Sequence, residues 1–305
     1  MKLSIRPFSV VLAVCLVVPF LFGQALDPAQ EAQRANELVA NGNLDEAIRI
    51  YDRLVRAFPS NPGLLLNLSI AEFKAKRYHD AIDHARSALK LKPNLASADL
   101  FLGASYLELH QQAKALDPLH KALQAMPNDP NAHLMLAEAL LACRSYEEAL
   151  NEFRKSSDLL PDNPKVWYGL GQVYDALTER AARDLETNFP DSVYSSVLAG
   201  DSYVRQRRFG SAFAAYREAL ARGPAIPGIH AGLARVYKQT GHSEWAAQEE
   251  TLEANVAPVQ PTTSGPAAYY WSSKSYRQLA DRAYDRLAQL PPSLESHLHA
   301  AKALD

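Results

Sequence analysis

Side chains that could carry out chemistry are few and scattered along this sequence. No pair among the nine histidines has the HExxH spacing of a zinc protease, and none joins cysteines in a zinc-finger pattern. Gly169-Leu170-Gly171 lacks the third glycine and the preceding strand of a dinucleotide-binding loop. No GxSxG nucleophile motif is present. We therefore expect no bound metal, no cofactor and no catalytic activity.

Cysteine chemistry is equally sparse. Cys15 lies in an N-terminal apolar segment and Cys143 lies far along the chain. A chain that loses the first of them keeps a single thiol and cannot form an internal disulfide. We expect Cys143 to be a free, half-buried thiol, and stability must then come from packing.

Composition fits a packed protein that does not bind nucleic acid. The 305 residues are 48% hydrophobic and 22% charged, with a formal net charge of −2. No run of five or six like charges and no basic stripe occurs, and a nucleic-acid partner would need one.

The first 25 residues resemble an export signal. Lys2 and Arg6 precede an apolar run from Phe8 to Phe22, and small residues at Gly23 and Ala25 fit a peptidase site. The run is shorter than the roughly 20 residues of a spanning helix. We expect a signal peptide over residues 1–25, cleavage after Ala25, a periplasmic or extracellular protein, and no stable membrane span after cleavage. An uncleaved N-terminal anchor is the alternative.

A 34-residue period dominates the rest of the chain. It is marked by two series of residues spaced 34 apart, namely Pro59, Pro93, Pro127 and Pro161, and Ala47, Ala81, Ala115 and Ala149. Between successive prolines lie two apolar stripes of helical spacing separated by a polar break. Each unit is therefore predicted to be a helix, a turn and a second helix, and stacked units must cover one another's apolar faces.

These units resemble the tetratricopeptide repeat. Trp167, Leu170, Gly171 and Tyr174 fit the first half of its pattern, and later positions are fitted by Gly200, Tyr203, Phe209, Ala212, Tyr216, Ala219 and Pro224. The resemblance implies an all-α fold, a right-handed superhelical solenoid of helix–turn–helix repeats. It places seven units over residues 28–255, starting at Pro28, Pro62, Ala96, Pro130, Pro164, Val193 and Pro227.

Two departures from the period are visible. Pro190 follows Pro161 by 29 residues, which predicts a fifth unit whose second helix is about a turn short. Residues 256–268 read as a Pro/Thr/Ser linker, either a mobile joint or a folded-back loop. Residues 269–305 then echo unit five at a distance of 102 and predict a short repeat followed, from Ser293, by one further unpartnered helix. Such an end favours self-association, a partner at that end, or a longer chain.

The resemblance also implies a concave groove lined by the first helix of each unit. The groove residues are apolar in units two to four and mostly polar in units five to seven: Leu66, Ile70, Phe73, Leu100, Leu107, Leu134, Leu141, Tyr168, Gln172, Asp201, Arg205, Arg235 and Lys238. The apolar members could instead pack between repeats. His133, His230 and His297 share repeat position 4, where a packing role is expected.

These patterns favour a non-catalytic scaffold or adaptor of the cell envelope that binds a peptide or partner helix in its groove. Two alternatives remain: a self-assembling structural protein, or the regulatory or substrate-binding part of an enzyme whose catalytic region lies elsewhere. The identity of the partner does not follow from a repeat fold.

Overall fold

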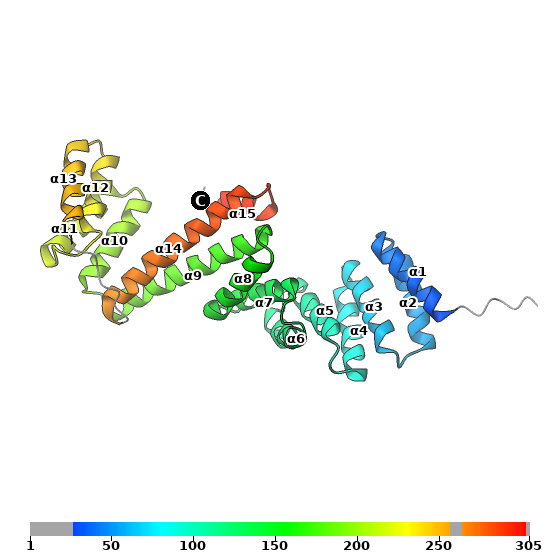
Figure 1. The fold of residues 1–305 in the computed structure, drawn as a ribbon. Coiled ribbons are helices and arrows are strands. Elements are labelled where there is room, and N and C mark those ends of the chain that lie inside the picture. The colour runs from blue at the N-terminus through cyan, green and yellow to red at the C-terminus, as the bar shows by residue number, and fades with distance from the viewer. Residues whose placement is uncertain (1–26, 257–263, 303–305) are drawn as a thin grey trace, which may run out of the picture.

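A computed structural model describes residues 27–256 and 264–302 of the chain, and these residues form helices and no strand (Figure 1). The predicted signal peptide, most of the linker and residues 303–305 lie outside the described residues. The predicted fold class, an all-α solenoid of stacked helix pairs, is confirmed. The first eight helices are α1 Pro28–Ala40, α2 Leu44–Ala57, α3 Pro62–Lys74, α4 Tyr78–Leu91, α5 Ala96–Glu108, α6 Gln112–Ala125, α7 Pro130–Ala142 and α8 Tyr146–Leu159.

Helix starts in this half follow from local sequence. α1, α3 and α7 each begin with a proline at the first turn, where the missing N–H costs no hydrogen bond. The side chains of Asp27, Asn61 and Asp129 accept hydrogen bonds from backbone amides of the turn that follows. Units one, two and four therefore start at a proline and a capping side chain, whereas α5 of unit three starts at Ala96 without a side-chain cap.

The turn inside each pair places one residue in the left-handed region. Gly42 and Gly241 fill this position in the first and last pairs, whereas Lys76 has φ 61° in the second. The amide of Lys76 donates to Phe73 O and that of Arg77 to Glu72 O, so the helix ends in a Schellman motif. A non-glycine residue here costs roughly 1–2 kcal/mol of backbone strain.

Small residues let the two helices of a pair approach closely, as predicted. A Cβ added to Gly103 would lie 2.5 Å from Leu119 Cγ, and one added to Gly200 would lie 2.6 Å from a ring carbon of Tyr216. Leu119 and Tyr216 are fully buried. The glycine and the large side chain thus fill one packing position together.

The fifth unit differs from its prediction. Residues Pro164–Asn188 form one continuous 25-residue helix, α9, and the expected turn with its short second helix is absent. Thr178 stands where other units turn, but it is buried inside the helix and its hydroxyl donates to Tyr174 O. A straight helix leaves the inner face of α9 without a local partner.

The missing partner comes from about a hundred residues further along. Gly265–Gln289 forms α14, also a single 25-residue helix, which runs antiparallel along α9 (Figure 1). The prediction of a short repeat after the linker is therefore wrong. The linker prediction also extends too far, since residues 265–268 are already helical. A Cβ on Gly171 would lie 2.3 Å from the Tyr284 ring, so Tyr284 takes the place that Tyr216 has in its own pair.

The 102-residue echo now has a structural explanation. Tyr174 stacks on Tyr276 with ring centroids 6.4 Å apart, and Arg277 Nη1 lies 2.8 Å from Asp175 Oδ1. Both pairs join residues separated by 102 positions. Two straightened repeats therefore cross as an antiparallel pair with an approximate twofold axis near these contacts.

Two ordinary helix pairs are inserted between α9 and α14. They comprise α10 Val193–Arg205, α11 Phe209–Arg222, α12 Ile229–Gln239 and α13 Ser243–Ala254. They lie beyond the C-terminal end of α9 and the N-terminal end of α14 (Figure 1). The seven predicted units thus become six local pairs and the α9–α14 pair among the described residues.

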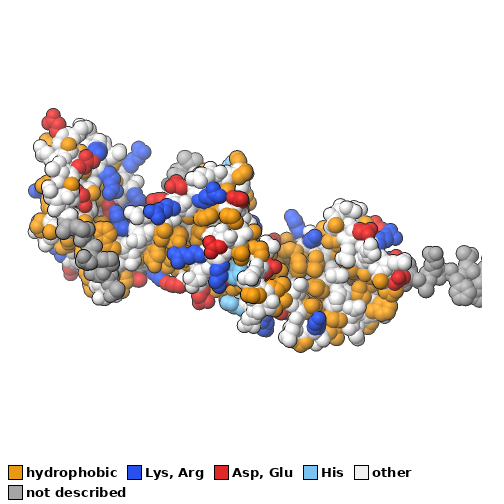
Figure 2. Space-filling view, in the orientation of Figure 1, with side chains coloured by type: hydrophobic (Ala, Val, Ile, Leu, Met, Phe, Trp, Pro, Cys, Tyr) orange, Lys and Arg blue, Asp and Glu red, His pale blue; other side chains and the backbone are white. Residues whose placement is uncertain are grey.

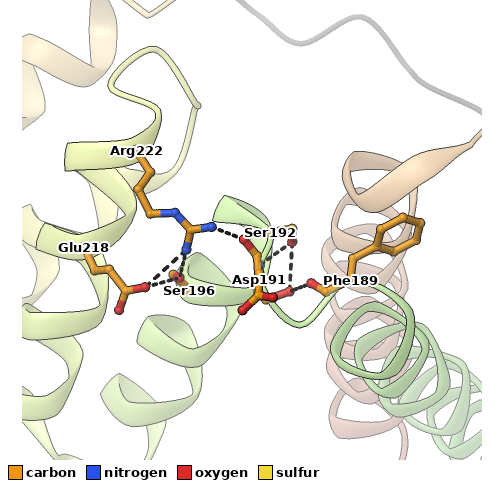
Figure 3. A network of polar contacts seen from close by, with 7 residues as sticks. Phe189, Asp191, Ser192, Ser196, Glu218 and Arg222 are labelled. Carbon is orange, nitrogen blue, oxygen red and sulfur yellow. Dashed lines mark hydrogen bonds and ion pairs between the residues drawn. The ribbon is translucent and has the colours of Figure 1, made fainter.

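Arg222 fixes this insertion to the end of α9 (Figure 3). Its guanidinium donates to the Asp191 carbonyl in the α9–α10 turn and, at 3.2 Å, to Glu218 of its own helix. Ser192 caps α10 through the Ser195 amide at 3.1 Å. The short turn is therefore held from both sides.

The last described helix, α15 Leu294–Lys302, packs on α9 and α14. The His299 ring stacks on Tyr284 with centroids 3.7 Å apart. Leu294 and Leu298 remain 69% and 46% exposed. The helix predicted from Ser293 is present, and it leaves two leucines facing outward.

Candidate functional site

The predicted apolar groove is partly a packing surface. Leu134 is only 6% exposed and belongs to the main core, so no ligand reaches it in this structure. Phe73 lies 5.5 Å from the Phe101 ring, centroid to centroid, and bridges neighbouring units. The other apolar members are half-buried: Leu66, Ile70, Leu100, Leu107 and Leu141.

Three predicted groove residues meet at one open recess of about 490 Å³, which we call the apolar recess. Leu141 comes from α7, and Tyr168 and Gln172 come from α9. Leu294 and Leu298 of α15 form the opposite wall. The remaining lining residues are Glu138, Ala142, Phe153, Lys165, Gly169 and Glu295. The contribution of α15 was missed by sequence reasoning, because it depends on how α14 returns to α9.

Charge in the apolar recess is mostly negative. Burial raises the pKa of Glu138, and the nearby carboxylates of Glu108 and Glu295 raise it further, while Lys165 opposes them. Glu138 makes no hydrogen bond or ion pair with another described residue. The recess therefore combines leucine walls with a carboxylate that has no hydrogen-bond partner among the described residues.

The polar groove residues converge on a second hollow of about 520 Å³, the polar recess. Asp201, Arg205 and Arg235 line it together with Lys274 and Arg277 of α14. Figure 2 shows Lys and Arg side chains on the visible face over α10, α12 and the neighbouring part of α14. Lys238 is not part of it.

Asp201 is a structural hub and not an exposed groove residue. Its side chain is 4% exposed, and its carboxylate accepts from the Tyr216 hydroxyl at 2.8 Å and from Lys274 Nζ at 3.0 Å. Burial, reinforced by the Asp201 charge, raises the pKa values of Tyr216 and Tyr270. One carboxylate thus joins α10, α11 and α14.

Two of the histidines at repeat position 4 pack between the helices of a pair. His133 Nδ1 lies 2.5 Å from Glu152 Oε2, and His230 Nδ1 lies 2.6 Å from Glu249 Oε2. Both are buried, which confirms the packing role expected for them. His297 is exposed, so that role does not extend to it.

The described residues hold no cluster of three or more His, Cys, Asp or Glu side chains arranged for a metal ion. Cys143 is a free, half-buried thiol, as predicted. Within the same residues, no helix combines the length and apolar character that a membrane crossing requires.

Family comparison agrees with the geometry. Two family models, both described as tetratricopeptide repeat, match residues 33–96 and 197–254, and residues 106–167, respectively. The matched segments cover more than half of the chain, and residues 168–196, where α9 replaces a local pair, lie between them. The chain belongs to the tetratricopeptide-repeat family.

Individual relatives match parts of the chain. The TPR repeat-containing thioredoxin TTL4 of Arabidopsis thaliana is 29% identical over 91 residues, which cover 30% of this chain and only 13% of that protein. Among solved structures, a MamA RS-1 double mutant is 27% identical with a TM-score of 0.45, covering 48% of this chain and 83% of that one. YrrB, described as a TPR protein with an unusual peptide-binding site, is 19% identical with a TM-score of 0.43, covering 65% and 87%.

Proposed function

We propose that this chain is a non-catalytic scaffold that binds a peptide or helix of a partner protein in the apolar recess. One observation carries the proposal: Leu141 and Tyr168, from two different units, face the exposed leucines of α15 across an open hollow. Contiguous exposed apolar surface on a soluble protein commonly marks an interaction site.

The recess suits such a ligand in size and place. A volume of about 490 Å³ falls within the range of roughly 300–1,000 Å³ that is usual for ligand pockets. α7, α9 and α15 present their side chains from rigid helices, so binding would need little reordering. An amphipathic helix or a short peptide could place two or three side chains there.

The proposal extends to location. The basic start and apolar run of residues 1–25 support export to the periplasm or the cell exterior, and hence a partner in the cell envelope. N-terminal sequencing of the purified protein tests this part. A mature chain beginning at Leu26 supports export with cleavage, and an intact N-terminus supports the anchored alternative.

Affinity capture from an extract of the source cells tests the binding site. The double variant Leu294→Glu with Leu298→Glu places charge in the recess at positions that are already exposed. The control is Leu91→Glu with Leu252→Glu, at leucines of similar exposure elsewhere. Partners captured by wild type and control but lost with the α15 variant support the proposal. Retention of the same partners by the α15 variant refutes it.

A second candidate is self-assembly through the same leucines, because they are exposed apolar residues on α15. Light scattering of the purified chain distinguishes the two. A dimer that the α15 variant dissociates favours self-assembly, and a monomer at high concentration removes it.

A further inference from the structure

The carboxylate of Glu138 is an unusual feature of an otherwise apolar hollow. It lies on α7 among Leu141, Tyr168 and Leu298, and no described residue donates a hydrogen bond to it. Glu138 is half-buried, and a carboxylate that is partly removed from water without a hydrogen-bond partner is costly. The geometry therefore leaves a negative group whose natural counterpart is a cation from outside.

The charges that line the recess beside Glu138 are also unbalanced. Glu295 lines the same recess from α15. Lys165 is the one cationic side chain among the lining residues, and it forms no ion pair with a described residue. Two lining carboxylates against one lining ammonium leave the recess with a net negative charge.

The apolar walls restrict the form that the cation can take. A hydrated metal ion or a small polycation would gain nothing from Leu141, Leu294 and Leu298. Lysine and arginine side chains carry an aliphatic stem that packs on apolar surface and a charged head that stays at a polar edge. A tyrosine such as Tyr168 is also a favourable neighbour for such a head.

We propose that the apolar recess receives a lysine or arginine side chain of the partner, its stem against Leu141 and Leu298 and its cationic head at Glu138 and Glu295. This inference rests on the proposed function and specifies the chemistry of the ligand. It predicts a basic residue within an apolar stretch of the bound segment.

Small probes test the charge requirement without knowledge of the partner. In the protein with labelled leucine methyl groups, hexylammonium, hexanol and hexanoate are titrated separately and followed by NMR. The expected result is saturable shifts at the methyls of Leu141, Leu294 and Leu298, with hexylammonium binding at least about five-fold more tightly than hexanol and hexanoate binding least.

Two isosteric variants locate the charge. Glu138→Gln should remove most of the preference for hexylammonium over hexanol, and Glu295→Gln should reduce it. Glu148→Gln, at an exposed position of α8, should leave it unchanged. Helicity by circular dichroism confirms that each variant is folded.

The outcomes separate this inference from the function on which it rests. Equal binding of hexylammonium and hexanol at the recess overturns the cation but leaves an apolar docking site. Absence of any shift at the recess methyls overturns the proposed binding of a lysine or arginine side chain. The affinity capture described above then tests the scaffold function independently. A preference for hexylammonium that survives Glu138→Gln also overturns the assignment.

Discussion

Gly171→Ala tests whether α14 really supplies the second helix of unit five. An added methyl would lie 2.3 Å from one ring carbon of Tyr284 and 2.4 Å from another, so the ring must move. The Tyr284 hydroxyl donates to Asp175 at 2.8 Å, and a displaced ring loses that bond as well. Overpacking costs about 1–3 kcal/mol and a hydrogen bond to a charged group about 1.5–3. Alanine regains about 1 kcal/mol of helix propensity. We expect a net destabilisation of about 1.5–5 kcal/mol.

Gly210→Ala is the matched control, since a methyl on Gly210 of α11 meets nothing within 4 Å. It should stabilise the protein by up to roughly 1 kcal/mol. Urea unfolding measures both variants, and hydrogen exchange locates the effect. Exchange should accelerate in α9 and in the C-terminal half of α14 for Gly171→Ala alone. Equal unfolding free energies of the two variants, or faster exchange confined to α11, would refute the α9–α14 pairing.

Three further predictions follow from single contacts. Asp201→Ala leaves the hydroxyl of Tyr216 and the ammonium of Lys274 without their buried acceptor and should cost about 3 kcal/mol in urea unfolding, whereas a loss below about 1 kcal/mol would contradict its hub role. Lys76→Gly relieves a left-handed backbone and should raise the unfolding free energy by roughly 0.5–1 kcal/mol, and a loss of stability would contradict this. The hydrogen bond to Glu72 raises the pKa of His84 above its ordinary value of 6.5, so its stabilising effect is complete at low pH and is lost as pH rises through the raised value. His84→Gln should therefore destabilise the protein more at about pH 5.5 than at about pH 8.5, and the opposite order would refute the pairing.

The first four units could be predicted from sequence because their determinants are local. Proline spacing, the caps at Asp27 and Asn61, and the small-to-large pairing of Gly103 with a leucine all act within 34 residues. The shape of unit five could not be predicted in this way. Lys76 and Thr178 occupy the same repeat position. The backbone turns at Lys76, whereas it stays helical through Thr178. The difference depends on whether a distant helix covers the exposed face.

The candidate site shows the same division. Leu141, Tyr168 and Gln172 were predicted as groove residues from repeat position and do line the apolar recess. Leu134 occupies the same repeat position as Tyr168, and Asp201 the same position as Gln172. Both Leu134 and Asp201 are nevertheless buried, because neighbouring helices cover them. Repeat position fixes the face of a helix, whereas tertiary packing decides which part of that face stays open.

Site-specific photocrosslinking tests directly whether a partner binds in the apolar recess. A photoreactive phenylalanine analogue replaces Tyr168 in the recess in one protein and Trp245 in another, the latter being 49% exposed on α13. After irradiation in the source cells, binding in the recess predicts a discrete crosslinked partner from position 168 and none of the same mass from position 245. The same adduct from both positions, or an adduct from position 245 alone, would contradict binding in the recess.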